Sequence, residues 1–166
     1  MSDVMQVHGF GFAFAGRFIG IVPKQFLTFI DQVPWIKQKL QEKAPGFLEK
    51  IREMDDAGVE MAGDDSEFEL NELLQDYEWD YTACYGLVSL YVDTVNEISG
   101  IGLDVQRDDE EGDIVMLVQA GPWEYTPKQL QIKSTEDLSS IIEECSARSG
   151  FFCDTAADFV TAEAWG

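Results

Sequence analysis

Residues suited to nucleophilic catalysis are few in this chain. His8 is the only histidine, and the thiols are those of Cys84, Cys145 and Cys153. A serine or cysteine hydrolase needs its nucleophile beside a base, and no Gly-x-Ser-x-Gly turn is present. His8 lies in a glycine- and phenylalanine-rich run typical of a strand, whereas Cys84 and Cys145 belong to apolar helical stripes. We therefore expect buried free thiols and no catalytic residue.

The sequence also lacks the residue spacing of a metal or cofactor site. No two cysteines are paired as Cys-x-x-Cys, as in zinc sites. The acidic run 108–113 lacks the alternating oxygen ligands and the distant glutamate of a calcium loop. The Gly9-Phe10-Gly11 sequence does not open a phosphate-binding loop, and Gly-Lys-Ser/Thr is missing. We expect no metal, cofactor or nucleotide.

An enzyme that uses clustered carboxylates is the alternative from another class. The nearest match to the motif of a metal-dependent hydrolase is Asp113 followed by Gln131-Ile132-Lys133. The match is weak, and a net charge of −21 opposes the approach of a polyanionic substrate.

The acidic residues are segregated along the chain. Of its 166 residues, 32 are acidic and 11 are basic, yet residues 1–52 contain seven basic and four acidic residues. Residues 53–80 contain twelve acids and no lysine or arginine. This balance excludes direct binding to nucleic acid, because phosphates repel carboxylates. Clustered carboxylates also repel one another, so their segregation predicts a specific basic partner.

Five segments have the pattern of strands, and they predict a small, mainly antiparallel sheet. In the first strand, Phe10, Phe12 and Phe14 share one face, and the small residues of the other face predict a closely packed helix. An antiparallel hairpin is expected around the loop 108–113. The tail fits a strand or a helix, and a strand that pairs with another strand of the sheet is favoured. The expected strands are residues 7–14, 17–22, 103–107, 114–118 and 158–165.

Proline and capping signals predict helices in the segments of the chain that lie between these strands. Pro23, Pro34 and Pro45 each stand at a helix start, and Trp35, with Ile36 and Leu40, is expected to face inward. The lysines of the third helix are expected to face solvent, and the basic helical hairpin is expected to be a solvated surface. Further helices are predicted over 68–77, over 84–98 as the central buried helix, and from Ser134, an expected N-cap, to Gly150.

The chain is therefore predicted to be one α+β domain in which a small antiparallel sheet packs against several helices. It has a basic helical part over residues 1–52, a mobile acidic loop over about 55–66 and an acidic part over 67–166. The longest stretch without charged residues, 4–16, is too short to cross a bilayer. An odd number of cysteines fits a reducing compartment, so we expect a cytoplasmic protein, in the host cytoplasm if a phage encodes it.

The candidate partner-binding residues lie in and around the predicted helix 68–77. Leu70, Leu73, Leu74 and Tyr77 form an inner stripe, and acids occupy another face. The alternation over residues 77–81 fits a short strand equally well. The expected contact residues are Asp64, Asp65, Glu67, Glu69, Glu72, Asp76, Glu78 and Asp80 as phosphate mimics, with Tyr77, Trp79 and Tyr81 as hydrophobic anchors.

The predicted function is that of a non-enzymatic acidic inhibitor, a decoy that binds a basic nucleic-acid-binding protein. In size and charge the chain is similar to small acidic phage proteins that block host defence nucleases, anti-CRISPR and anti-restriction inhibitors among them. It is equally similar to immunity proteins that neutralise nuclease toxins. The similarity is one of composition, and no family motif accompanies it. A solvated acidic face with no inhibitory role is the remaining alternative.

Overall fold

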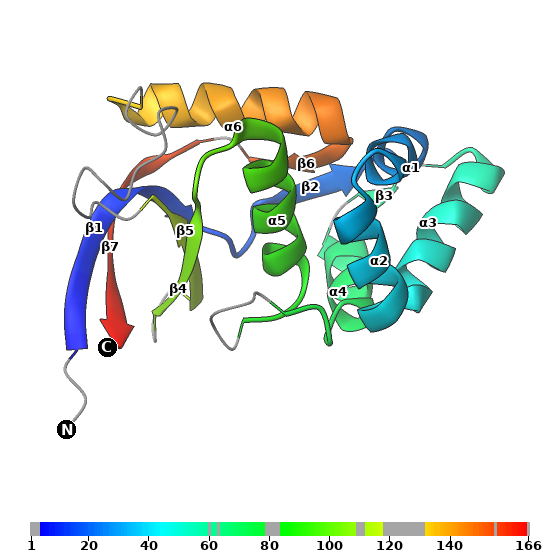
Figure 1. The fold of residues 1–166 in the computed structure, drawn as a ribbon, viewed down its shortest axis with the longest axis horizontal. Coiled ribbons are helices and arrows are strands. Elements are labelled where there is room, and N and C mark those ends of the chain that lie inside the picture. The colour runs from blue at the N-terminus through cyan, green and yellow to red at the C-terminus, as the bar shows by residue number, and fades with distance from the viewer. Residues whose placement is uncertain are drawn as a thin grey trace.

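The computed structural model describes residues 4–59, 61–62, 64–78, 84–108, 112–117, 132–154 and 156–165. Its helices are α1 (Pro23–Asp31), α2 (Pro34–Lys43), α3 (Pro45–Ala57), α4 (Asp64–Leu73), α5 (Leu87–Ser99) and α6 (Thr135–Ser149). Its strands are β1 (Val4–Ala13), β2 (Phe18–Ile21), β3 (Met61–Ala62), β4 (Asp104–Asp108), β5 (Gly112–Met116), β6 (Phe151–Cys153) and β7 (Asp158–Trp165). The predicted α+β class is confirmed. Figure 1 shows β1, β4, β5 and β7 at one end, α1 to α4 at the other, and α6 lying across the top.

The larger sheet has four antiparallel strands in the order β4-β5-β1-β7. The predicted hairpin is confirmed as β4 and β5, in which Val105 lies opposite Val115. The predicted tail strand is confirmed as β7, which pairs with β1 from Val4 opposite Trp165 to Gly11 opposite Asp158. A second sheet has the order β3-β2-β6 and joins the strand-rich end to the helices.

The glycine face of β1 meets a strand, not the helix that the sequence predicts. A Cβ atom at Gly9 would overlap the carbonyl oxygen of Leu117, and one at Gly11 would overlap that of Val115. The two glycines therefore let β5 and the residue after it approach the backbone of β1 closely. Helix α5 contributes Tyr91 to the opposite, phenylalanine face, at 6.2 Å from Phe12 between ring centroids.

The helices begin where the local signals place them. Proline occupies the first turn of α1, α2 and α3, and the Ser134 side chain accepts a hydrogen bond of 3.1 Å from the Asp137 backbone N–H at the start of α6. Trp35 differs from the prediction, because it is exposed and its indole N–H donates a 3.0 Å hydrogen bond to Glu97. Within the described residues, no helix has the length and apolar character needed to cross a membrane.

The core is centred on α5, whose residues from Leu87 to Val95 are all buried. Tyr91 of this helix contacts the rings of Phe14 at 5.4 Å and Phe151 at 5.6 Å between centroids. The predicted central buried helix is thus confirmed, although it begins at Leu87 and not at Cys84.

The segment expected to be an acidic loop, residues 55–66, is largely regular structure. Asp55 and Asp56 belong to the last turn of α3. Gly58 follows this helix as its C-cap, with φ of 69°. Met61 and Ala62 then form β3 against β2, and α4 begins at Asp64. Asp–Asp and Gly-containing pairs predicted a loop because they are common in turns, but helix packing and strand pairing extend across most of the segment.

Candidate partner-binding surface

Helix α4 ends at Leu73 and not at the predicted Tyr77, but the buried and acidic residues are separated as the sequence predicts. Leu70 and Leu74 are fully buried, whereas Glu69, Glu72 and Asp76 are exposed. Residues three or four positions apart are neighbours on a helix, so the first two acids lie side by side. The third lies in the turn that follows α4.

Phe68 is a site residue that our sequence analysis missed. Its side chain is 68% exposed, the largest exposed fraction among the described large apolar side chains. The signal was available, because Phe68 lies two positions before Leu70, about 200° around the helix and therefore off the buried stripe. Phe68 is instead four positions before Glu72, on the acidic side. We call Phe68, Glu69, Glu72 and Asp76 the α4 surface.

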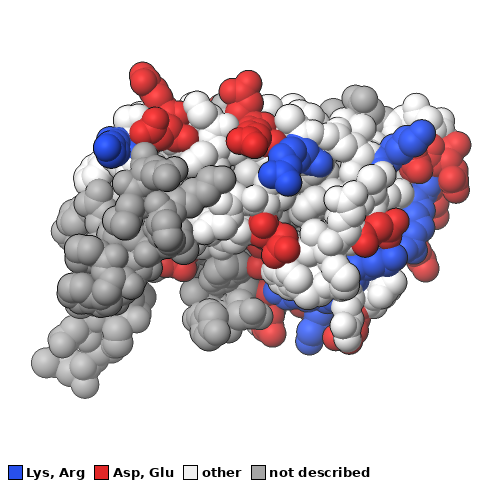
Figure 2. Space-filling model, turned by 45° about the horizontal axis from the view of Figure 1, so that its top comes forward, with Lys and Arg blue, Asp and Glu red and all other residues white. Residues whose placement is uncertain are grey.

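One acid of the α4 surface has an intramolecular counterion. Lys50 Nζ of α3 lies 2.9 Å from Glu69 Oε1, and the two side chains are 24% and 51% exposed. Lys50 was expected to face solvent, and the structure shows it partly buried and paired with an acid. Figure 2 likewise shows basic side chains beside acidic ones at the helical end of the molecule. Charges segregated along the sequence are therefore partly mixed in space.

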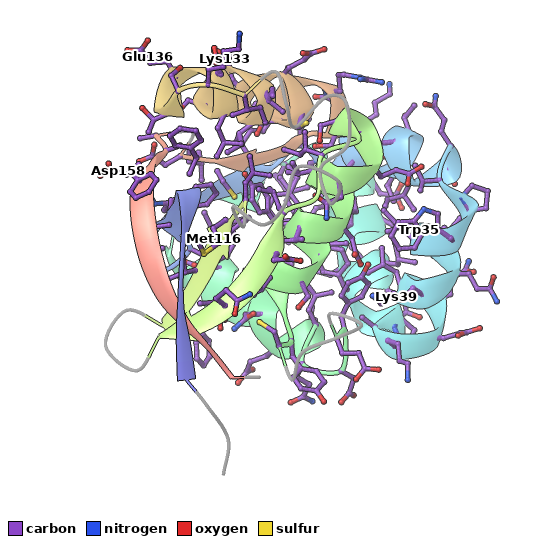
Figure 3. The ribbon with its side chains drawn as sticks, turned by 60° about the vertical axis from the view of Figure 1, so that its left-hand side comes forward. Trp35, Lys39, Met116, Lys133, Glu136 and Asp158 are labelled. Carbon is purple, nitrogen blue, oxygen red and sulfur yellow. The ribbon has the colours of Figure 1, made fainter. Side chains whose placement is uncertain are left out.

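A second lysine–carboxylate pair, Lys39 with Asp93, is largely buried beside Tyr77. Tyr77 is therefore not a surface contact residue, contrary to the prediction. Tyr77 is fully buried, and its hydroxyl donates a 2.6 Å hydrogen bond to Asp93 Oδ2 of α5. The same oxygen lies 3.0 Å from Lys39 Nζ, which also sits 4.3 Å from the centroid of the Tyr77 ring. Lys39 is labelled on α2 in Figure 3. Tyr77 thus ties α2 and α5 together inside the fold and is no surface anchor.

The remaining predicted contact residues are placed as follows. Asp64 and Asp65 lie in the first turn of α4. Glu67 and Glu78 are half-buried, and Glu78 pairs in an isolated bridge with Tyr85, which is 45% exposed. The predictions for Trp79, Asp80 and Tyr81 concern positions outside the described residues.

The three cysteines are buried and free, as predicted. Burial raises the pKa of the Cys153 thiol, and the nearby carboxylates of Glu67 and Asp154 raise it further. A thiol held in its neutral form is a poor nucleophile. Among the described residues, no three His, Cys, Asp or Glu side chains are grouped so that they could hold a metal ion. Of the residues matched to the hydrolase motif, Gln131 lies outside the described residues.

The α4 surface presents three exposed carboxylates and one exposed aromatic ring. Carboxylates bind lysine and arginine through charge-assisted hydrogen bonds, and an aromatic side chain supplies apolar contact area at a protein interface. The surface is therefore suited to a cationic protein surface that has an apolar depression. Protein-family models, curated proteins and solved structures contain no match to this chain.

Proposed function

We propose that this protein is a non-enzymatic acidic inhibitor that acts in the cytoplasm by occupying the nucleic-acid site of a basic partner. Glu69, Glu72 and Asp76 take the place of phosphates in this mechanism. Phe68 replaces Tyr77 as the hydrophobic anchor. The observation that carries the proposal is the 68% exposure of Phe68 on the helix that also exposes Glu69 and Glu72 and buries Leu70.

The exposed phenylalanine favours a binding face over a face that serves only solubility. A solubility face gains nothing from an aromatic ring in water, because exposed apolar area is unfavourable by roughly 25 cal/mol per Å². At an interface the same ring is buried, and the acids around it steer a basic partner into register. Phe68 and the three acids therefore serve one interface.

The test compares two charge-matched triple variants as bait for proteins in a host lysate. Glu69→Gln, Glu72→Gln and Asp76→Asn neutralise the α4 surface, whereas Glu136→Gln, Glu143→Gln and Glu144→Gln neutralise three exposed acids of α6. If the α4 surface mimics phosphates, a basic nucleic-acid-binding protein is captured by the wild type and by the α6 variant. The α4 variant should lose about 1–3 kcal/mol of binding free energy to that protein.

Three further measurements test the phosphate-mimic mechanism. Added duplex DNA should release the captured protein, and capture should weaken steeply between about 50 and 200 mM salt. The wild type should also inhibit the partner's activity on nucleic acid, and Phe68→Ser should inhibit less at unchanged net charge. Equal losses from both triple variants would reduce the effect to bulk charge. Binding without inhibition would leave an acidic interaction module in place of an inhibitor.

A further inference from the structure

A pocket of about 350 Å³ lies between α1 and α6, in a different part of the fold from the α4 surface. Helix α1 supplies Lys24, Gln25, Thr28 and Phe29 to its lining, and α6 supplies Arg148. Its volume falls at the small end of the range for small-molecule sites, roughly 300–1,000 Å³.

The charge of this pocket is opposite to that of the protein. Both ionisable residues of its lining, Lys24 and Arg148, are basic, although acids outnumber bases by 32 to 11 in the chain. Lys37, Lys39 and Lys50 are each paired with a carboxylate at 2.7–3.0 Å. Lys24 and Arg148 form no ion pair with any described residue. The pocket therefore offers two positive charges that the described part of the fold leaves uncompensated.

The acid nearest to Arg148 along α6 does not enter the pocket. Glu144 precedes Arg148 by one helical turn and lines a much smaller cavity, of about 10 Å³, which Arg148 also borders. The pocket of interest contains no carboxylate in its lining. An anion placed there would consequently meet both cations without a competing acid in the same pocket.

The uncharged part of the lining is suited to hold an organic anion in one orientation. The Gln25 amide donates to the carbonyl oxygen of Ala147 and so fixes α1 against α6. The Thr28 hydroxyl donates to the Lys24 carbonyl oxygen at 2.9 Å, so its proton is already used within α1. The side-chain amide of Gln32 has no hydrogen bond to a described residue. Phe29, 8% exposed, supplies an apolar wall.

The net charge of −21 does not prevent an anion from binding there. At an ionic strength of 0.15 M the screening length is about 8 Å, so exposed carboxylates farther away contribute little. The two cations, by contrast, border the pocket itself.

We propose that this pocket binds a small phosphate monoester with a compact apolar substituent. The Arg148 guanidinium is the group that can take two phosphate oxygens at once, and the Lys24 ammonium adds a second positive charge. Phe29 contacts the substituent. This site is independent of the proposed inhibitory function and holds whether or not the α4 surface binds a partner.

Phenyl phosphate is the probe, and two-dimensional NMR of the isotope-labelled protein is the measurement. Backbone amide signals of α1 from Lys24 to Asp31, together with that of Arg148, should shift and saturate in the millimolar range or below. Benzyl alcohol, which lacks the charge, should cause no saturating shift. Inorganic phosphate tests the phosphate group without the ring, and benzoate tests a carboxylate on the ring. Both should bind more weakly than phenyl phosphate. Benzoate binding as tightly would replace the phosphate monoester by a carboxylate ligand and overturn the proposal.

Matched variants distinguish the pocket from general attraction to bases. Lys24→Gln with Arg148→Gln should weaken phenyl phosphate binding at least tenfold. Lys43→Gln with Arg52→Gln removes two exposed bases that do not line the pocket, and it should change binding less than twofold. All four side chains are exposed, so both variants should retain the melting temperature. Shifts scattered over the surface, no saturation, or equal losses in both variants would each refute the site.

Discussion

Lys50 Nζ lies 2.9 Å from Glu69 Oε1, so a base from α3 already occupies one acid of the α4 surface. A basic partner must therefore compete with Lys50 for this carboxylate. The affinity of the α4 surface for a basic partner is therefore lower than it would be with three unpaired acids. Lys50 opposes binding although it lies beside the interface.

Lys50→Gln should strengthen the binding of a cationic probe. Freeing Glu69 from a partly exposed pair should add about 0.2–1 kcal/mol to binding and change the free energy of unfolding by no more than that. A fluorescent octalysine peptide, titrated at low salt, measures the effect, and Glu69→Gln provides the control of opposite sign. If octalysine binds Lys50→Gln no more tightly than wild type, the pair does not compete.

The buried network of Lys39, Asp93 and Tyr77 should dominate the stability of the helical end. Asp93→Ala leaves a largely buried ammonium and a buried hydroxyl without their acceptor, at a cost of about 3–5 kcal/mol. Tyr77→Phe removes a single hydrogen bond and should cost about 0.5–1.5 kcal/mol. Urea denaturation of both variants provides the comparison, and equal losses would contradict the network.

Asp104 should make the fold more stable as the solution is acidified. Although the residue as a whole is exposed, partial desolvation of its carboxyl group raises the Asp104 pKa in the folded state. Between the unfolded and folded pKa values the native state binds more protons, so this contribution to stability falls as pH rises. Asp104→Asn should therefore stabilise the protein at pH 7, by less than about 0.5 kcal/mol at such a surface position, and the gain should vanish below the unfolded pKa. Melting temperatures measured at pH 3 and pH 7 test both statements.

Self-repulsion among the acids should make the melting temperature rise with ionic strength. Going from about 0.01 to 0.15 M shortens the screening length from roughly 30 to 8 Å, and a gain of 1 kcal/mol corresponds to roughly 2–4 °C for a chain of this size. Calorimetry in NaCl measures it. A flat or falling melting temperature would mean that ion pairs such as Lys37–Asp31, at 2.7 Å, outweigh the repulsion.

The elements that local signals specify could be predicted from the sequence. Proline at a helix start, the Ser134 cap and the alternating strands of the hairpin act within a few residues, and each of them has its predicted counterpart in the structure. The inner stripe of α4 was predictable for the same reason, since its period places Leu70 and Leu74 on one face.

What the sequence missed depends on neighbours that are distant along the chain. Lys39 meets Asp93, and Lys50 meets Glu69, only because α2 and α3 pack beside α5 and α4. Tyr77 was predicted to be a surface anchor because it adjoins an acidic run. Its hydroxyl is instead buried and donates to the carboxylate of Asp93, which belongs to another helix. The helical stripe did place Tyr77 on the inner face, but no local pattern identifies Asp93 as its partner.

The pairing of β1 with β7 has a consequence for synthesis on the ribosome. Strand β1 is translated before its neighbours β5 and β7, from which it is separated along the chain by α1 to α5 and by α1 to α6. Until these neighbours are made, its phenylalanine-rich face and both backbone edges lack their native contacts, and an unpaired strand edge readily joins other chains. A ribosome stalled between α6 and β7 would hold a nascent chain in which β1 has gained β5 and still exposes its other edge. That stage is the one at which a chaperone matters most.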